Sequence, residues 1–598
     1  MLQGTGSDVG KSVLVAGLCR LFADRGLRVR PFKAQNMSNN AAVTADGGEI
    51  GRAQALQAIA CRVPPSIDMN PVLIKPESDT GAQLVVHGRV VGRREAGEWP
   101  TERGALLEPV LASWSRVSVG ADLVLVEGAG SPAEINLRAG DIANMGFARA
   151  ADVPVVLVGD IDRGGVIAAL VGTRAVLDPA DAAMIEGFAI NKFRGDPRLF
   201  DEGITAIERA SGWPCLGVIP WLHDAARLPA EDAVAIGREA HEPDAGSGDG
   251  SRRLRIAAPL LSRIANADDA DPLRHEPGVT FRFVPPGRPI PRDTDVILLF
   301  GTKSTRAEMA FTERQGWHHD IHAHARNGGA VLGLCGGFQL LGDTIDDPHG
   351  QDGSPGSTPG LGLLAVRTRM AEHKVVRRVG GRCALADVPI TGYEIHVGDT
   401  TGRDRHRPML LLDGMPEGAR SEDGRIEGSY VHGLFAEDAY RQAWLTRRRT
   451  AAGYLQGPAG TSKDSMTPGT HAGYAASIDR ALDGIAGQLD DALDAAARVS
   501  GASYLRRLTR IQAPLLAGPA VSGAILVFLT AYNEITVSAL LWSSGNETIG
   551  TVIFNYEDGG YTTLASAMSV LVILATITLM LLLRLFARRL PAGVVPWA

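Results

Sequence analysis

The sequence is poor in cysteine, in excess positive charge and in secretory signals, and each absence excludes a class of protein. Five cysteines are scattered over 598 residues without a C-x-x-C pair, so neither a disulfide framework nor a zinc site is expected. Basic residues do not exceed acidic ones, and the net charge of -7 argues against a nucleic-acid partner. No charged and then apolar signal segment opens the chain, so we expect a cytoplasmic catalytic body.

A glycine-rich turn opens the sequence with the letters M-L-Q-G-T-G-S-D-V-G-K-S. In such a turn, backbone N–H groups face one phosphate, while Lys11 adds a cation and Ser12 offers a hydroxyl to Mg²⁺. The residues that follow have helical spacing and stop at Gly26, which is the setting that a phosphate loop requires. An ordinary glycine-rich turn is the alternative, because Thr5 stands where G-x-x-x-x-G-K-[ST] has its first glycine. The pattern therefore predicts ATP binding by Gly10, Lys11 and Ser12.

Only three residues precede Gly4, whereas a buried central strand has about five residues. The sequence therefore predicts either that the true start of the chain lies upstream or that this form binds ATP weakly.

Apolar stretches alternate with helical ones in the first part of the chain, which indicates a doubly wound parallel α/β sheet. Polar side chains follow these stretches, at the sheet edge where ligands bind in such folds. The polar residues predicted to bind the nucleotide are Lys33, Asn36, Glu127, Asn191 and Lys192. Glu127 follows the strand expected at 123–126, and together with Ser12 it can hold Mg²⁺. For the segment around Lys33 and Asn36, a plain polar loop is the alternative.

A second chemical centre is predicted at A-V-L-G-L-C-G-G-F-Q, where an apolar strand, 330–334, leads into Cys335 and two glycines. Such a strand-to-helix turn exposes a nucleophile above the sheet edge, and the helix N-terminus favours the thiolate. A thiolate needs a base, and the spacing favours His432, at the end of a short strand about a hundred residues downstream. On the residues alone, His396 is a competing candidate.

Several motifs then carry a resemblance to a known family. F-K-A-Q-N-M-S-N-N, V-E-G-A-G-S-P-A-E-I-N-L, D-I-D-R-G-G and N-K-F-R-G-D resemble the cobyric acid synthase family of glutamine-dependent amidases, whose N-terminal half is similar to dethiobiotin synthetase. G-L-C-G-G-F-Q, G-Y-E-I-H and Y-V-H-G-L-F resemble its class I glutamine amidotransferase domain. The resemblance implies that Cys335 and His432 react and that Gly301 and Gly336 contribute to an oxyanion hole. Many class I relatives carry an acid at the position of Leu434, so the third triad member is unassigned.

The resemblance also implies the reaction and its partners. With ATP, Mg²⁺ and glutamine as ammonia donor, the b, d, e and g carboxylates of the corrinoid adenosylcobyrinic acid a,c-diamide would be amidated to give adenosylcobyric acid. Two alternatives belong to other classes: a MinD-type P-loop scaffold ATPase and a membrane transport subunit. The first normally has an additional early lysine in its phosphate loop, and residues 4–10 contain none.

The end of the chain differs in kind. Residues 494–514 resemble the coupling loop of binding-protein-dependent ABC permeases, and two apolar runs, 515–542 and 564–583, are each long enough to cross a bilayer. We expect a fused permease-like fragment, with membrane contact only through 515–583 and anchoring in the inner membrane, both ends facing the cytoplasm.

The expected organisation has five parts. They are an ATP-binding amidoligase domain at 1–235, a linker at 236–252, a glutamine amidotransferase domain at 253–450, a closing segment with an amphipathic helix at 451–493, and the permease-like fragment with its two spans at 494–598.

Overall fold

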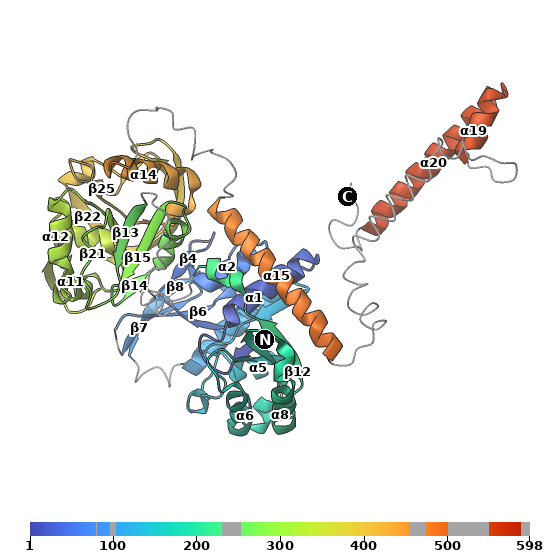
Figure 1. The fold of residues 1–598 in the computed structure, drawn as a ribbon, viewed down its shortest axis with the longest axis horizontal. Helices are drawn as coiled ribbons and strands as arrows, with labels where there is room; N and C mark the ends of the chain where they lie inside the picture. The colour runs from blue at the N-terminus through green and yellow to red at the C-terminus, as the bar shows by residue number, and fades with distance from the viewer. Residues whose placement is uncertain (79, 96–102, 230–252, 455–472, 500–548, 588–598) are drawn as a thin grey trace. The chain divides into compact units, whose positions relative to one another are not determined.

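The computed structural model describes residues 1–78, 80–95, 103–229, 253–454, 473–499 and 549–587 (Figure 1). They belong to two compact units, one made of Met1–Leu21 with Val29–Ala492 and the other of Phe22–Arg28 with Leu493–Ala598. The linker predicted at 236–252 lies outside the described residues.

The N-terminal region, residues 1–229, is built on a parallel sheet. Strands β1, β10, β11 and β12 lie in that order, and β2 pairs with β9 in parallel. A parallel bridge between Leu2 and Glu127 joins the two sets. The strands are β1 (Leu2–Gly4), β2 (Val29–Phe32), β9 (Leu123–Val126), β10 (Val155–Asp160), β11 (Ile185–Phe193) and β12 (Cys215–Pro220). The helices between them are α1 (Lys11–Asp24), α4 (Leu107–Ser118), α5 (Met145–Ala150), α6 (Val166–Val176), α7 (Pro179–Ala182) and α8 (Asp201–Ser211).

The predicted α/β fold is therefore confirmed for this region. The apolar runs form its buried centre, where Phe32, Leu157 and Phe188 are fully inaccessible to solvent. Strand β1 is short, and each of its three residues pairs with β10.

Between β2 and β9 the chain adds an arm that the sequence did not indicate. It contains a hairpin, β4 with β5, that leads into helix α2, and a mixed four-stranded sheet in the order β3-β6-β7-β8. Their bounds are β3 (Gln35–Met37), β4 (Ala41–Val43), β5 (Glu49–Gly51), α2 (Arg52–Ala60), β6 (Val72–Pro76), β7 (Gly81–Val86) and β8 (Arg89–Glu95).

The central region, residues 253–454, has a second sheet in the order β15-β13-β16-β18-β26-β25, parallel except for the last pair. Beside it lies a seven-stranded sheet dominated by the long hairpin of β21 and β22. The strands are β13 (Leu254–Pro259), β14 (Ile264–Ala265), β15 (Val279–Val284), β16 (Val296–Leu299), β17 (Gly301–Thr302), β18 (Ala330–Leu334), β19 (Thr344–Asp347), β20 (Gly356–Pro359), β21 (Val366–Cys383), β22 (Pro389–Gly402), β23 (Leu410–Leu412), β24 (Met415–Glu417), β25 (Ala419–Arg420), β26 (Ile426–Ser429) and β27 (Val431–His432). The helices are α10 (Asp271–Arg274), α11 (Thr305–Arg314), α12 (Trp317–Arg326), α13 (Gly336–Leu341) and α14 (Asp438–Ala451).

The predicted amphipathic helix is α15 (Tyr474–Val499), and it lies along α1 (Figure 1). Four of the five apolar residues predicted for its inner face are buried; they are Ile478, Leu482, Ile485 and Leu489. The fifth, Leu493, is 40% exposed. Gly17 of α1 allows the close approach, because a Cβ at that position would lie 2.5 Å from Cγ2 of Ile485. Arg20, only 1% exposed, forms an ion pair with Asp479.

In the second unit, the structure describes α19 (Ile549–Asp558) and α20 (Thr562–Ala587). Of the helices in the described part of the chain, none combines the length and the apolar character that a bilayer crossing requires. The span predicted at 515–542 lies outside the described residues. The run predicted at 564–583 is helical, as part of α20, but its prediction as a membrane span is not supported.

The contrast between two leucines of α15 gives a test of its docking. Leu482→Ala removes a fully buried side chain and should reduce the free energy of unfolding by about 2–5 kcal/mol. Leu493→Ala, the matched change on the same helix, should alter it by less than about 0.5 kcal/mol. Urea unfolding of the full chain measures both, and equal effects would contradict the packing of α15 described above.

Candidate active site

Cys335 lies at a sharp turn between β18 and α13, as the sequence predicted. Its backbone has φ 52° and ψ -109°, a conformation that is costly for a residue with a side chain and that is found at functional positions. Two glycines make the turn sterically feasible. A Cβ at Gly337 would lie 2.0 Å from the carbonyl oxygen of Leu299, and one at Gly336 would lie 2.8 Å from the backbone nitrogen of Thr302.

His432 lies next to Cys335 and is held by a carboxylate. Its Nδ1 is 2.7 Å from Oδ2 of Asp269, and the backbone N–H of Gly433 donates to Oδ1 of the same carboxylate at 2.6 Å. Burial alone would lower the pKa of His432, but the charge of Asp269 and the interaction with Cys335 outweigh it and raise the pKa to about 10. The imidazole is therefore protonated at neutral pH, and an imidazolium stabilises a neighbouring thiolate.

Gly301, predicted for the oxyanion hole, faces both of these side chains. A Cβ built on it would lie 3.2 Å from Cε1 of His432 and 3.6 Å from Cβ of Cys335. Gly336 is the first residue of α13, directly after Cys335. The structure thus brings both predicted glycines to the nucleophile.

His396, the competing candidate for the base, has a different environment. Its Nδ1 lies 2.9 Å from the carbonyl oxygen of Gly398, and its ring stacks on Tyr430 with the centroids 3.8 Å apart. Burial lowers the pKa of His396 to about 4, so the ring is neutral at physiological pH. The carboxylate contact is made by His432 instead.

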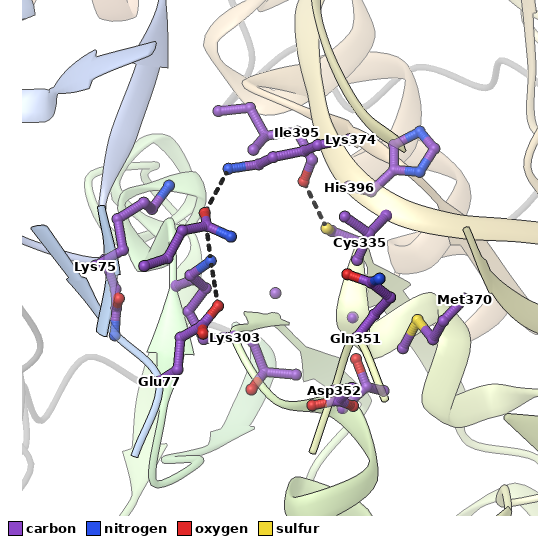
Figure 2. Close-up of a pocket in the computed structure, with 18 of the residues that line it drawn as sticks. Lys75, Glu77, Lys303, Cys335, Gln351, Asp352, Met370, Lys374, Ile395 and His396 are labelled. Atoms are coloured by element: carbon purple, nitrogen blue, oxygen red, sulfur yellow. Dashed lines mark hydrogen bonds and ion pairs between the residues drawn. The ribbon is translucent and has the colours of Figure 1, made fainter. Parts of the chain in front are cut away.

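The Cys335 side chain opens into a cavity of about 240 Å³ that is lined by two parts of the chain. The central region supplies Cys335, His396 and Lys374, and the N-terminal region supplies Lys75 and Glu77 (Figure 2). The cavity therefore joins the candidate glutaminase centre to the arm inserted between β2 and β9.

Three lysines and two acids, one of them buried, cross this junction. Glu49 is fully buried and accepts from Lys75 at 2.8 Å and from Lys374. Burial would raise the pKa of Glu49, but the two ammonium groups lower it well below its usual range. Burial also lowers the pKa of Lys374, to about 7, despite the neighbouring Glu49. Lys303 contacts Glu77 at 3.3 Å, as Figure 2 shows.

A second centre forms around Glu127, which is 1% exposed at the end of β9. Its Oε1 accepts from the Ser12 hydroxyl at 2.8 Å and from Lys33 Nζ at 2.7 Å. Its Oε2 accepts from Gln57 Nε2 at 2.5 Å. Lys11 extends over the phosphate loop and donates to the carbonyl oxygens of Gly6 and Gly130. Four residues that the sequence predicted for the nucleotide, Lys11, Ser12, Lys33 and Glu127, therefore share one site.

The remaining predicted residues take different places. Asn191 donates to the carbonyl oxygen of Val9 at 2.7 Å, and Lys192 donates to that of Asp8 at 2.6 Å, so both support the phosphate loop. Gly10 has φ 93°, and a Cβ there would lie 2.4 Å from Nδ2 of Asn191. Asn36 donates instead to Oε1 of Gln54 at 3.0 Å, outside the set of hydrogen bonds that Glu127 accepts.

Sequence reasoning missed Asp269 and Gln57. Asp269 lies 163 residues before His432, in the acidic stretch A-N-A-D-D-A-D-P, and that stretch was its only signal. Gln57 lies in the middle of α2, and nothing in the surrounding letters distinguishes it.

In the part of the chain that the structure describes, no cluster of three or more His, Cys, Asp or Glu side chains is arranged to hold a metal ion. The oxygens of Ser12 and Glu127 that were predicted to bind Mg²⁺ are 2.8 Å apart, close to the separation of about 2.9 Å between neighbouring ligands in an Mg²⁺ octahedron. Their chemistry and spacing therefore fit the predicted ion.

Comparison with known proteins gives three family matches. Residues 1–235 match the CobQ/CobB/MinD/ParA nucleotide binding domain, and residues 255–440 match the CobB/CobQ-like glutamine amidotransferase domain. Residues 480–594 match the binding-protein-dependent transport system inner membrane component. Among solved structures, PurLQS from Thermotoga maritima aligns with 34% of this chain at 16% identity and a TM-score of 0.27, which is too low to carry an argument.

Curated relatives are far more similar. The cobyric acid synthase of Hyphomonas neptunium is 62% identical over 494 residues, which are 83% of this chain and 95% of that protein. The cobyric acid synthase of Caulobacter sp. strain K31 is 58% identical over 504 residues, 84% of this chain and 99% of that protein. The chain belongs to the cobyric acid synthase family.

Proposed function

We propose that this chain is an ATP-driven, glutamine-dependent amidoligase that converts the b, d, e and g carboxylates of adenosylcobyrinic acid a,c-diamide to amides, giving adenosylcobyric acid. The observation that carries the proposal is the set Cys335, His432 and Asp269, of which Cys335 and His432 line a cavity whose far wall belongs to the nucleotide-binding region. Family membership supports the choice of substrate.

In the first half-reaction, the Cys335 thiolate attacks the side-chain amide carbon of glutamine. Backbone N–H groups near Gly301 and Gly336 stabilise the negative oxygen of the tetrahedral intermediate. His432 gives its proton to the departing nitrogen, ammonia leaves, and a glutamyl thioester remains on Cys335. Water, deprotonated by His432, then attacks the thioester and releases glutamate. Asp269 holds the imidazole in place throughout, through its 2.7 Å contact with Nδ1.

In the second half-reaction, the γ-phosphoryl group of ATP passes to a substrate carboxylate, which makes an acyl phosphate and ADP. Ammonia attacks the acyl carbon, and inorganic phosphate leaves. Lys11 would offset the charge that builds up on the phosphates. Ser12 and Glu127 would hold Mg²⁺, which supplies further positive charge there.

The cavity beside Cys335 supports the coupling of the two half-reactions. Because its far wall includes Lys75 and Glu77 of the N-terminal region, ammonia released at Cys335 enters a space shared by both regions. The segment at 480–594, which matches a membrane transport component, supplies none of the residues named for either half-reaction.

Replacing the nucleophile should separate the two half-reactions. Cys335→Ala should reduce glutamine-driven amidation by at least about 10³-fold, because the thioester cannot form. Ammonia-driven amidation should stay within about twofold of the unchanged enzyme, since the nucleotide site is intact. Both rates are followed by ADP release with the corrinoid diamide. The control is Cys383→Ala, a buried cysteine outside the cavity; glutamine-driven turnover in Cys335→Ala would contradict the assignment.

Changing the phosphate loop should give the opposite pattern. Lys11→Met should lower amidation by at least about 100-fold with either nitrogen source, because a cation at the transferred phosphoryl group is lost. Hydrolysis of glutamine to glutamate should persist, because Cys335 and His432 are unchanged. Arg198→Met removes a highly exposed cation of the same region and serves as the control. Normal ammonia-driven amidation in Lys11→Met would exclude this loop as the ATP site.

Asp269→Asn tests the third member of the set. Glutamine hydrolysis should fall by roughly 10²–10⁴-fold, the range expected when a triad acid is neutralised. The pKa of His432 should fall from about 10, because burial still lowers it and the carboxylate that raises it is gone. The alkaline limb of the glutaminase pH profile should therefore move toward neutral pH. An unmoved alkaline limb, measured as kcat/KM between pH 6 and pH 10.5, would refute the role of Asp269.

A further inference from the structure

Helix α2 contacts both centres, one from its first residue and the other from its middle. At its first residue, Nε of Arg52 lies 2.8 Å from Oδ2 of Asp268, the neighbour of Asp269 in the sequence. One and a half turns later, Gln57 donates to Glu127 beside the phosphate loop at 2.5 Å. Because a helix rises 1.5 Å per residue, the Cα atoms of these two residues are separated by only about 7.5 Å along the axis.

The turn that carries Asp269 is held by the N-terminal region at a second point as well. Asn266, which precedes the turn Ala267–Ala270, has φ 52°, so its backbone is strained. Its N–H donates to Oδ1 of Asn40 at 2.7 Å, and its side-chain oxygen accepts from the N–H of Ala41 at 3.1 Å. Its side-chain nitrogen donates to the hydroxyl of Tyr393, whose ring stacks on His432 with centroids 5.4 Å apart. The N-terminal region is therefore linked to the His432 imidazole in two ways, through the turn that carries Asp269 and through Asn266 and Tyr393.

The turn that carries Asp269 holds several buried carboxylates, and Arg52 neutralises one of them. Asp268, Asp269 and Asp271 are 6%, 4% and 4% exposed, so three carboxylates are crowded together away from water. Three side chains supply opposing positive charge: Arg52 pairs with Asp268, His432 with Asp269, and Arg274 with Asp271. Burial raises the pKa of Asp268 and Arg52 opposes that shift. Without Arg52, ionised Asp268 would repel Asp269 and disturb the alignment of His432.

We propose that Arg52 is a positioning residue for glutamine hydrolysis: it acts through Asp268 on the turn that aligns Asp269 with His432, and α2 transmits the state of the nucleotide site to that turn. The proposal rests on the function proposed above. Glu127 accepts from Ser12 and Lys33 at Oε1 and from Gln57 at Oε2, so a metal ion held by Ser12 and Glu127 would act on the same carboxylate that Gln57 contacts. Because Gln57 and Arg52 lie on the same helix, a displacement of α2 at Gln57 would also displace Arg52.

The test compares Arg52→Gln with the unchanged full-length enzyme. Its kcat for glutamine hydrolysis should fall by about 10- to 100-fold, the effect of a displacement of about 1 Å, with KM for glutamine little changed. Ammonia-driven amidation should stay within about twofold, because neither Cys335 nor His432 takes part in it. In the unchanged enzyme, a non-hydrolysable ATP analogue with Mg²⁺ should alter the rate of glutamine hydrolysis by about 5-fold or more, and in Arg52→Gln it should not.

The pH dependence separates positioning from general damage. In Arg52→Gln, protonated Asp268 carries no charge at low pH and does not repel Asp269. As the pH rises through its raised pKa, Asp268 ionises without a cationic partner at position 52. Glutamine hydrolysis should therefore decline over a pH range in which the rate of the unchanged enzyme is constant. The double variant Arg52→Gln with Asp268→Asn removes the uncompensated charge and should regain at least about tenfold of the lost rate, yet remain unresponsive to the ATP analogue. Arg116→Gln, which breaks an exposed ion pair with Asp68, is the matched control and should behave like the unchanged enzyme.

Four results would each overturn the proposed role of Arg52. A normal kcat in Arg52→Gln, no recovery in the double variant, an equal loss of ammonia-driven amidation, or a preserved response to the ATP analogue would overturn the role of Arg52. An unchanged enzyme that fails to amidate the corrinoid with glutamine would instead overturn the proposed function, so the two failures are distinguishable.

Discussion

A carboxylate buried away from water must be paired or hydrogen-bonded, and this requirement organises both centres of the molecule. Glu127 draws the phosphate loop and Lys33 onto the end of β9, through contacts of 2.7–2.8 Å with Ser12 and Lys33. Asp269 draws a turn near the start of the central region onto His432, 163 residues later. Residues far apart in the sequence thus meet at a buried anion that needs their hydrogen bonds.

The same requirement links the two regions to each other. Glu49 of the N-terminal region is fully buried and needs both Lys75 from its own side and Lys374 from the hairpin β21–β22. Breaking one partner of such a set is strongly destabilising, since it leaves a buried charge uncompensated. Correct docking of the N-terminal arm is therefore a condition for burying these charges.

The parts of the site that could be predicted are those fixed by local rules. Cys335 was found because a strand that ends in a left-handed residue and enters a helix at once requires glycines around it, and the letters show them. Lys11 and Ser12 were predicted because a glycine-rich turn leads straight into a helical stretch, and Glu127 was predicted because it directly follows the buried strand β9. The predicted strands at 123–126 and 330–334 have the bounds observed for β9 and β18.

Contacts between distant segments escaped prediction because no local pattern encodes them. Asp269 is one of three acids in a short stretch, and only the fold distinguishes it from Asp268 and Asp271. The arm from β3 to β8 was missed since its strands are short and its pairing is mixed. Leu493 was expected inside but is 40% exposed; it belongs to the second compact unit, whereas the four buried residues of the same helix face belong to the first.

The carboxylate that contacts His432 comes from a turn that the N-terminal region also contacts. An acid at the position of Leu434, two residues after His432, would assemble the triad from one short segment of the central region. Leu434 is instead buried and apolar, and Nδ1 of His432 turns to Asp269, on a turn that Arg52 and Asn40 hold from outside that region. Moving the acid to this turn makes alignment of the base depend on the docked N-terminal region. Under the proposed function, alignment of the base for glutamine hydrolysis would thus depend on the region that consumes the ammonia.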